Sequence, residues 1–367
     1  MAFANYLNPE TFKEAKRILK DENTSQVIKS ISQKIIVGDA LSREEIIYLL
    51  GLKDSPDRKA LFALANAVRR DNVGETIFIK GIIEFSNYCK RDCTYCGIRA
   101  SCKVKRYRME PDEIVEVAID SAKHGIDTII LQSGEDPFYT TDIMIDIIKR
   151  IKLGARRPIS LSIGERTPEE FKLFKEAGAS KCLLKQETIN PRIFRSVHGS
   201  DYETRISLLK TLVSLGYIAG GGDIIGLPNQ TLGDIADDII FMRDIGIKMA
   251  GIGPFIPTKN TPLENHPIGS ADVTLNAYAC TRLAIPTIFM PTTTALGTID
   301  PGLQYEGFEA GCNVIMVNFT PDNYRQVYRI YDNKRKVEFY ETVHELLKRG
   351  KKLSFSVMKA LREEEMV

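Results

Sequence analysis

The chain has 367 residues, and 43% of them are apolar, which is enough for a large buried core rather than one small domain. Its 50 lysine and arginine residues are balanced by 48 acidic ones, so the formal charge of +2 gives no electrostatic argument for a nucleic-acid partner. No apolar run approaches the roughly 18–20 residues of a transmembrane helix, and the N-terminal sequence lacks the basic-then-apolar order of a signal peptide. These features predict a cytoplasmic protein with no membrane partner.

The first 75 residues are predicted to form a helical extension. Apolar residues recur there at helical spacing, in segments that also carry many charges. Ser42, followed by Arg-Glu-Glu, suits the start of a helix. The predicted helices cover residues 9–20, 24–37, 42–51 and 56–70.

From Thr76 onward, short β-branched runs alternate with longer amphipathic segments, which predicts a parallel sheet with crossover helices. Strands are expected at 76–85, 127–132, 158–163, 180–185, 217–225, 248–252, 287–290 and 312–316. Eight strands spaced ~25–40 residues apart fit a closed (βα)8 TIM barrel, an α/β fold, over residues 76–335, with an incomplete barrel of about six units as the alternative. Residues 336–367 would add two helices as a C-terminal cap.

The chain contains seven cysteines. An odd count in a protein expected in the cytosol does not suggest a disulfide framework. Three lie close together after the first predicted strand, whereas the others are scattered and are expected mainly to be small buried side chains. The clustered residues are Cys89, Cys93 and Cys96, and the scattered ones include Cys182, Cys280 and Cys312.

Three clustered thiolates predict a particular kind of metal site. Thiolates are the usual ligands of iron–sulfur clusters, which normally take four. Three protein ligands leave one iron open for a small molecule, as catalytic zinc sites keep one position open. A structural zinc site or a redox cysteine pair is the alternative, and zinc would need Cys102 as a fourth ligand because His124 is distant.

The spacing Cys-x3-Cys-x2-Cys, with Tyr95 directly before the third cysteine, resembles the signature of the radical S-adenosylmethionine (SAM) superfamily. The resemblance implies a 4Fe–4S cluster whose open iron binds the amine and carboxylate of SAM. An electron from the cluster would cleave the sulfonium and give a 5′-deoxyadenosyl radical, which abstracts hydrogen from a substrate. Tyr95 would lie against the adenine.

Residues 131–137 end the second predicted strand and contain Gly134, Glu135 and Asp136. A glycine followed by acids can present carbonyl and carboxylate groups to an ammonium. The segment resembles the Gly-Gly-Glu motif of the superfamily, which holds the amine of SAM. An ordinary strand-to-helix turn is the alternative interpretation.

Other predicted strands end with candidate cofactor residues on the same rim of the barrel. Glu165 follows the third strand, and Lys185 and Glu187 follow the fourth. Lys185 could pair with the SAM carboxylate and Glu187 could hold the ribose hydroxyls, with solvated rim charges as the alternative. Phe255 and Ile256 follow the sixth strand and would pair with the adenine edge, as the corresponding superfamily segment does.

A threonine-rich loop at 291–298 follows the seventh predicted strand. Its hydroxyls suit a carboxylate or another anion on the substrate, and polar residues after the eighth strand would join them. Hydroxyl capping of nearby helices is the alternative. The predicted substrate residues here are Thr292, Thr293, Thr294, Thr298, Asn318 and Arg325.

Longer stretches resemble one radical SAM family in particular, the HydE maturases of FeFe-hydrogenase, which are related to the methylornithine synthase PylB and to biotin synthase. They include Ile-Ile-Glu-Phe-Ser-Asn at 82–87, Gln-Ser-Gly-Glu-Asp-Pro at 132–137 and Thr-Thr-Ala-Leu-Gly-Thr at 293–298. The resemblance implies a long internal cavity and a small cysteine-derived substrate, whose carboxylate Thr293 and Thr294 would contact.

Two departures from the HydE pattern bear on the substrate. Lys185-Gln186-Glu187-Thr188 stands where HydE chains have Arg-His-Glu-Thr, and the Gln-Glu-Thr is closer to PylB. Asp223 is an acid that HydE chains lack, and it would point toward the cavity, where it could bind an amino group.

The leading hypothesis is therefore a HydE-like enzyme that attacks a small amino-acid-derived thiol, thioether or iron–cysteine complex. A PylB-like carbon-skeleton mutase is the main alternative. Sulfur insertion, as in biotin synthase, would need ligands for a second cluster, and Cys182 and Cys280 are single and separated. A non-catalytic metal-binding scaffold is a fourth possibility. The leading hypothesis implies an amino-acid-like small molecule and an electron donor such as ferredoxin or flavodoxin as partners.

Overall fold

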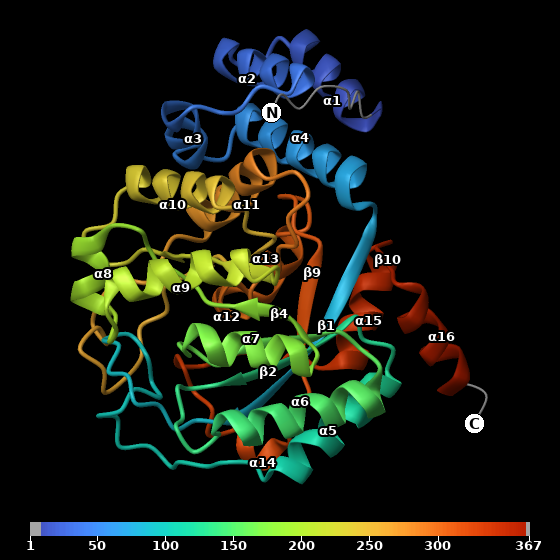
Figure 1. The fold of residues 1–367 in the computed structure, drawn as a ribbon. Helices are drawn as coiled ribbons and strands as arrows, with labels where there is room; N and C mark the ends of the chain where they lie inside the picture. The colour runs from blue at the N-terminus through green and yellow to red at the C-terminus, as the bar shows by residue number, and fades with distance from the viewer. Residues whose placement is uncertain (1–8, 365–367) are drawn as a thin grey trace.

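The N-terminal helices form a layer of their own beside the barrel. The computed structural model describes residues 9–364. Residues 1–8 and 365–367 lie outside the described part, and the first of these ranges includes part of the segment examined for a signal peptide. In Figure 1 the layer stacks above α10 (Leu232–Asp244) and α11 (Ala271–Ala284). Its members are α1 (Pro9–Lys20), α2 (Gln26–Val37), α3 (Arg43–Leu50) and α4 (Pro56–Val73).

The start of α3 shows how the sequence sets a helix boundary. The Ser42 Oγ accepts a hydrogen bond from the Glu45 backbone N–H, and the Glu45 carboxylate accepts one from the Ser42 N–H. This reciprocal arrangement satisfies two backbone donors that have no partner within the helix. The prediction of a helix start at Ser42 is confirmed.

The barrel wall is a parallel sheet in the order β9-β1-β2-β3-β4-β5-β7. Each of its strands lies where the sequence pattern predicts one. The strands are β1 (Thr76–Ser86), β2 (Thr128–Ser133), β3 (Ile159–Ser162), β4 (Ala179–Leu183), β5 (Ile218–Gly221), β7 (Met249–Ala250) and β9 (Val314–Asn318). Beyond the ends of β5 and β7, the short strands β6 (Ile224–Ile225) and β8 (Gly253–Pro254) pair with each other.

The ring closes through the segment that the sequence predicts as the seventh strand. Phe289 bridges in parallel to Met249 of β7, and Pro291 bridges in parallel to Val314 of β9. The segment makes only these isolated bridges, partly because Pro291 has no N–H to donate. The predicted (βα)8 barrel is confirmed, with one wall position formed by bridges instead of a regular strand.

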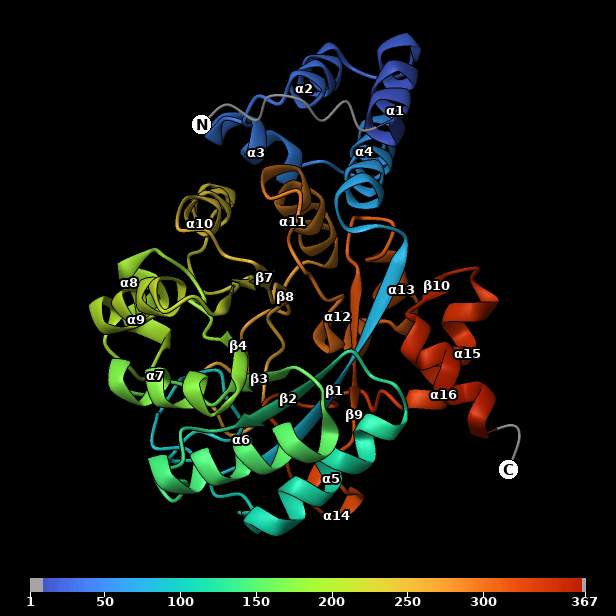
Figure 2. The same cartoon turned by 45° about the vertical axis from the view of Figure 1, so that its right-hand side comes forward.

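Helices surround this wall, as Figure 2 shows from a second direction. In the parallel crossovers they cover the outside of the sheet and bury its outer face. Besides α10 and α11, they are α5 (Pro111–Lys123), α6 (Thr141–Ala155), α7 (Pro168–Ala177), α8 (Pro191–Val197), α9 (Tyr202–Ser214), α12 (Thr294–Ile299) and α13 (Pro301–Glu306).

The C-terminal elements pack at the beginning of β1, away from the strand ends that form the site. Lys352 pairs in parallel with Thr76, the first residue of β1. A Cβ on Gly125 would lie 2.2 Å from the Ser356 carbonyl oxygen, so the loop before β2 also contacts this segment closely. These elements are α15 (Phe339–Lys348), β10 (Lys352–Leu353) and α16 (Phe355–Glu364), whereas α14 (Asp322–Arg325) follows the carboxyl end of β9, where Arg325 donates to the Asn318 carbonyl oxygen.

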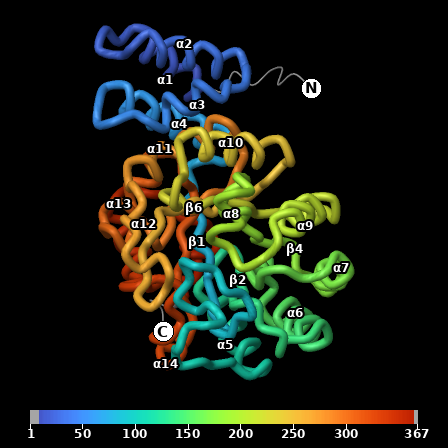
Figure 3. The backbone as a smooth tube through the Cα atoms, turned by 90° about the vertical axis from the view of Figure 1, so that its left-hand side faces the viewer, coloured from blue at the N-terminus to red at the C-terminus, as the bar shows by residue number. Residues whose placement is uncertain are grey.

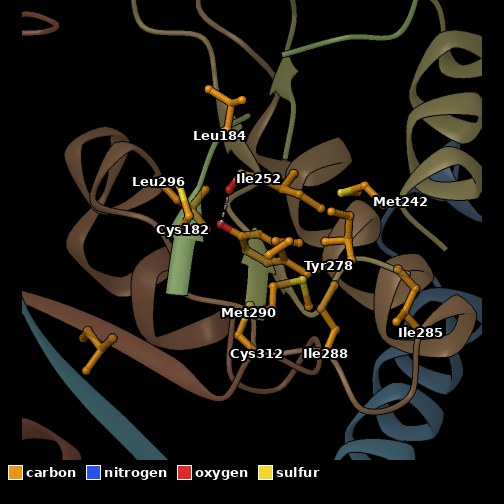
Figure 4. Packing of buried hydrophobic residues seen from close by; sticks show 14 of the residues in the cluster. Cys182, Leu184, Met242, Ile252, Tyr278, Ile285, Ile288, Met290, Leu296 and Cys312 are labelled. Carbon is orange, nitrogen blue, oxygen red and sulfur yellow. Dashed lines mark hydrogen bonds between the residues drawn. The ribbon is translucent and has the colours of Figure 1, made fainter. Parts of the chain in front are cut away.

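The scattered cysteines belong to the apolar core. Figure 4 shows Cys182 and Cys312 among aliphatic side chains around Tyr278, and Cys280 is also fully buried. The Tyr278 hydroxyl donates to the Ile252 carbonyl oxygen at 3.1 Å, which satisfies this buried polar group. Within residues 9–364, no helix is long and apolar enough to cross a membrane.

Candidate active site

A cavity of about 380 Å³ opens at the carboxyl ends of the barrel strands, where TIM-barrel enzymes place their active sites. All three clustered cysteines line it, at one end. Most of the predicted cofactor residues and two of the predicted substrate threonines also line it. These residues are Tyr95, Gly134, Glu135, Lys185, Glu187, Phe255, Ile256, Thr293 and Thr294.

The cysteine loop follows β1 and is held against α8, where the Thr94 N–H donates to the Val197 carbonyl oxygen at 2.8 Å (Figure 3). The Cys89 sulfur accepts from the backbone N–H groups of Arg91 and Glu135, each at 3.4 Å. The Cys93 sulfur accepts from the Gly199 N–H at 3.3 Å. Such N–H groups stabilise thiolates that bind an iron–sulfur cluster.

Burial raises the pKa of all three thiols, to about 11 for Cys93. A thiolate in this loop therefore needs a positively charged partner, and a coordinated metal provides one. In the described part of the chain, no three His, Cys, Asp or Glu side chains are arranged to hold a single metal ion.

Glycines let three chain segments approach the cysteine loop. A Cβ on Gly134 would come within 2.3 Å of the Tyr88 carbonyl oxygen, and one on Gly199 within 2.5 Å of the Asp92 nitrogen. A Cβ on Gly97 would lie 2.3 Å from the Arg329 carbonyl oxygen. The backbone is thus shaped around this loop in a way that any larger residue would disturb.

Two arginines connect the acids at the ends of β2 and β3. Arg91 donates to both Glu135 and Glu165 at 2.5 Å. Arg205, from α9, donates to Glu165 at 2.8 Å and to the Lys185 carbonyl oxygen at 2.7 Å. Glu165 is placed behind Glu135 by these contacts and does not line the cavity.

Asp136 also lies outside the cavity lining. Its carboxylate forms a bidentate pair with Arg108, at 2.7 and 2.9 Å, and accepts from the Ser86 hydroxyl at 2.6 Å. The aspartate therefore joins the end of β1 to the loop after β2, a position suited to fixing Glu135 rather than to contacting a cofactor.

Lys185 and Glu187 form a 2.7 Å ion pair on the cavity wall after β4. Glu187 has a φ of 60°, a left-handed conformation that is uncommon for a residue other than glycine. Strained residues of this kind concentrate at functional sites. Tyr95, next to them, packs on a small apolar cluster that includes Phe255 and Val197.

Asp223 is brought to the same region but lies behind the cavity wall. Its carboxylate is fully buried, does not line the cavity, and neither oxygen has a hydrogen-bond partner among the described residues. It faces Lys185, Glu187 and the buried Asp238 of α10. The expected orientation toward the cavity is not what the structure shows.

The threonine loop divides between two roles. Thr293 and Thr294 line the cavity, whereas Thr292 is fully buried and donates to the Gln304 carbonyl oxygen at 2.5 Å. Thr298 donates to the Thr294 carbonyl oxygen at 2.9 Å, a bond within α12. The residue at the N-cap of this helix, Thr293, makes no capping bond with its side chain.

Two of the predicted substrate residues lie beside the cavity and not in it. Asn318 donates from its Nδ2 to the Glu84 carboxylate at 2.9 Å. Arg325 donates to the Asn318 carbonyl oxygen at 3.2 Å and pairs with Asp322 and Glu338.

Several polar residues of the cavity are not among the predicted site residues, and they include Glu84, Gln132, Tyr328, Tyr331 and Lys334. The first two could have been found, because Glu84 and Gln132 occupy the last inward-facing positions of β1 and β2. The other three come from the irregular segment 326–336, for which no periodic pattern exists.

The barrel and the three-cysteine loop at its carboxyl end define the class of radical SAM enzymes. A sequence profile of the Radical SAM superfamily matches residues 83–242. The FeFe hydrogenase maturase subunit HydE of Thermotoga maritima is 45% identical over 296 residues, which cover 80% of this chain and 84% of that relative. The chain therefore belongs to the HydE family of the radical SAM superfamily.

More distant relatives share the fold. The 3-methylornithine synthase of Methanosarcina barkeri is 27% identical over 83% of this chain and 87% of that protein. A crystal structure of methylornithine synthase (PylB) superposes with a TM-score of 0.79 at 25% identity, over 88% of this chain and 97% of that one. A crystal structure of HydG, a maturase of the FeFe-hydrogenase, has the same TM-score at 21% identity, over 95% and 80% of the chains.

Membership of this superfamily makes the protein an enzyme with a 4Fe–4S cluster and SAM as cofactors. The residues present fit them. The Cys89 and Cys93 sulfurs accept backbone N–H groups, and the cavity that all three cysteines line has room for a small molecule.

Proposed function

We propose that this enzyme is a HydE-like radical SAM enzyme that attacks a small amino-acid-derived substrate, a thiol, a thioether or an iron–cysteine complex. When bound at the cysteine loop, the cluster and SAM supply an electron and a 5′-deoxyadenosyl radical. The observation that carries the proposal is one continuous cavity, which has Cys89, Cys93 and Cys96 at one end and Thr293 and Thr294 along its lining.

At the cofactor end, the three cysteines hold the cluster, and Gly134 and Glu135 receive the amine of SAM. Lys185 pairs with the SAM carboxylate, and Glu187 accepts from the ribose hydroxyls. Tyr95, Phe255 and Ile256 provide the apolar surface for adenine and exclude water from it. Asp136, Glu165, Arg91 and Arg205 act as positioning residues, because their ion pairs fix the loop that carries Glu135.

At the substrate end, the Thr293 and Thr294 hydroxyls receive a carboxylate. Thr292 and Thr298 fix this loop through their bonds to backbone carbonyl groups. Asn318 and Arg325 act as positioning residues. Asn318 donates to the Glu84 carboxylate, and Arg325 donates to the carbonyl oxygen of Asn318 at the end of β9. Asp223 acts on the same region through Lys185, which it faces.

A PylB-like mutase is the second candidate. The Gln186-Glu187-Thr188 stretch favours it, as does the similarity to 3-methylornithine synthase. The HydE relative is 45% identical and the synthase 27%, which favours the first candidate. We further propose that the enzyme works in the cytoplasm and takes its electrons from a ferredoxin or flavodoxin.

The test is anaerobic reconstitution followed by a measurement of 5′-deoxyadenosine formed from SAM under dithionite. The wild type and C280A, whose side chain lies in the apolar core, should carry iron and cleave SAM, whereas C96A should do neither. Stimulation by S-methyl-L-cysteine supports the HydE-like assignment, and stimulation by L-lysine supports the mutase. Iron-free, zinc-loaded wild-type protein would contradict both.

A further inference from the structure

The lining of the cavity contains a buried ion pair. Glu84, at the carboxyl end of β1, is only 1% exposed, and it lines the cavity. One carboxylate oxygen accepts from Asn318 Nδ2 at 2.9 Å, and the other pairs with the ammonium of Lys334. The Glu84 backbone N–H is satisfied separately, by the Thr320 hydroxyl at 2.7 Å.

Lys334 reaches this acid from the irregular segment 326–336. The backbone on both sides of it is fixed, because the Gly97 N–H donates to the Ile330 carbonyl oxygen and the Arg335 N–H donates to the Thr298 hydroxyl, each at 3.0 Å. Its ammonium lies 5.0 Å from the centre of the Tyr328 ring. A lysine side chain is long and flexible, so its ammonium can move while the segment stays in place.

Other charges that line the cavity already have partners at the cofactor end. Lys185 pairs with Glu187, and Arg91 pairs with Glu135. The Glu84–Lys334 pair is separate from those contacts and shares the cavity with Thr293 and Thr294. It therefore offers one carboxylate and one ammonium to a molecule that binds in the cavity.

We propose that Glu84 and Lys334 together recognise a zwitterionic amino acid by exchanging their ion pair for two new ones. The ammonium of the substrate replaces Lys334 at Glu84, and the released Lys334 receives the substrate carboxylate beside Thr293 and Thr294. This inference rests on the proposed function and narrows its substrate class to molecules with a free amino group and a free carboxylate.

The energetic argument follows from burial. Removing one partner from a buried ion pair leaves an uncompensated charge, which is strongly unfavourable. A zwitterion leaves none, because each protein charge gains a partner as it loses one. An N-acylated analogue would release Lys334 from Glu84 without replacing it, and an ester would leave Lys334 without a carboxylate. The empty site thus discriminates against both.

The test uses the reconstituted holoenzyme with its cluster oxidised and SAM present, so that binding is measured without turnover. Calorimetric titration compares S-methyl-L-cysteine with N-acetyl-S-methyl-L-cysteine and with S-methyl-L-cysteine methyl ester. The wild type should bind each blocked analogue at least about tenfold more weakly than the parent, about the cost of one lost interaction of 1.4 kcal/mol. E84Q should abolish the discrimination against the N-acetyl analogue, and K334M that against the ester.

K336Q is the matched control, because Lys336 belongs to the same segment but is about half exposed and pairs with Glu338 at the surface. It should discriminate like the wild type. Thermal melting and the visible absorption of the cluster show whether E84Q and K334M are folded. If either variant is unfolded, the comparison of the three ligands on the wild type decides alone.

Equal binding of the parent and both analogues to the wild type overturns the inference, as does unchanged discrimination in folded E84Q and K334M. Absence of any binding by S-methyl-L-cysteine also overturns it. These outcomes are distinct from failure of the proposed function. In that case the enzyme forms no 5′-deoxyadenosine under dithionite, whether or not the amino acid binds.

Discussion

A Cβ atom on Gly134 would lie 2.7 Å from the Cβ of Cys89, closer than such atoms approach in proteins. The loop after β2 and the cysteine loop after β1 are therefore in direct backbone contact. The Gly134 N–H donates to the Ser86 carbonyl oxygen at 3.1 Å, just before the cysteine loop begins. The position of the first cysteine thus depends on a residue without a side chain in the neighbouring loop.

We expect G134A to impair the cluster without unfolding the barrel. The new methyl group would meet the Tyr88 carbonyl oxygen as well as Cys89, and either would have to shift. Changes around metal ligands typically cost about 10–100-fold in metal affinity or activity, and we expect a loss of that order in SAM cleavage, with less iron per chain.

G154A is the control, because its Cβ on α6 would approach no backbone atom of another segment and only the Ile119 side chain, at 2.4 Å from Cδ1 and 2.9 Å from Cγ1, which can move aside. It should retain iron and activity, as measured by colorimetric iron assay and by 5′-deoxyadenosine formation. Full iron content and activity in G134A would show that the cysteine loop tolerates displacement.

We expect R205M to destabilise the enzyme by about 3–5 kcal/mol, the usual cost of leaving a buried charge without its partner. Arg205 is 4% exposed and donates to Glu165, which is itself buried and also bonded to Arg91. R150M removes exposed pairs with Asp112 and Asp146 and should have no measurable effect. Urea unfolding of the two variants measures the difference, and similar stabilities would mean that Arg91 alone neutralises Glu165.

The barrel was predictable because its elements follow simple rules. Buried parallel strands require short β-branched runs, and Pro or Ser/Thr/Asp residues begin the helices between them, as Thr167 does at α7. The seventh wall position shows the limit of such rules. At 287–291 the run is apolar, but a regular strand does not form, and only the bridges of Phe289 and Pro291 complete the ring.

The cysteine loop was predictable because three metal-binding residues lie together in the sequence. The ion pair proposed to bind the substrate was not predictable, because Glu84 and Lys334 are separated by 250 residues in the sequence. Asp223 shows a related limit. Sequence placed it at the correct strand end, but the direction of its side chain depends on the glycines before it, since Gly222 has a φ of 142°.

We expect C102S to keep its cluster, although Cys102 is the nearest further cysteine. Its sulfur is directed toward the carbonyl oxygens of Asn260, at 3.6 Å, and of Cys96, at 4.0 Å. A serine hydroxyl could donate to the same oxygens. Iron content and the cluster absorption of C102S should match the wild type, whereas C93S should lose both. Loss of iron in C102S would make it a fourth ligand and would reopen the zinc alternative.

Asp223 gives the stability of the enzyme a particular pH dependence. Burial raises the pKa of its carboxyl to about 7, the nearby Lys185 lowers this pKa, and Glu187 raises it. The ordinary pKa of an aspartate is about 3.9, so between these values the folded chain holds a proton that the unfolded chain has released. The free energy of unfolding therefore falls as the pH rises from about 3.9, the unfolded value, to about 7, the folded one.

We expect the wild type to lose stability relative to D223N as the pH rises from about 4 to about 7, because the amide has no charge to bury. Urea unfolding of both proteins across this range measures the difference, with D120N as the control at an exposed site. The control should run parallel to the wild type. If the pH dependence of the free energy of unfolding is the same in D223N as in the wild type, Asp223 stays ionised beside Lys185. Lys185 would then be shared between Asp223 and Glu187 before SAM binds.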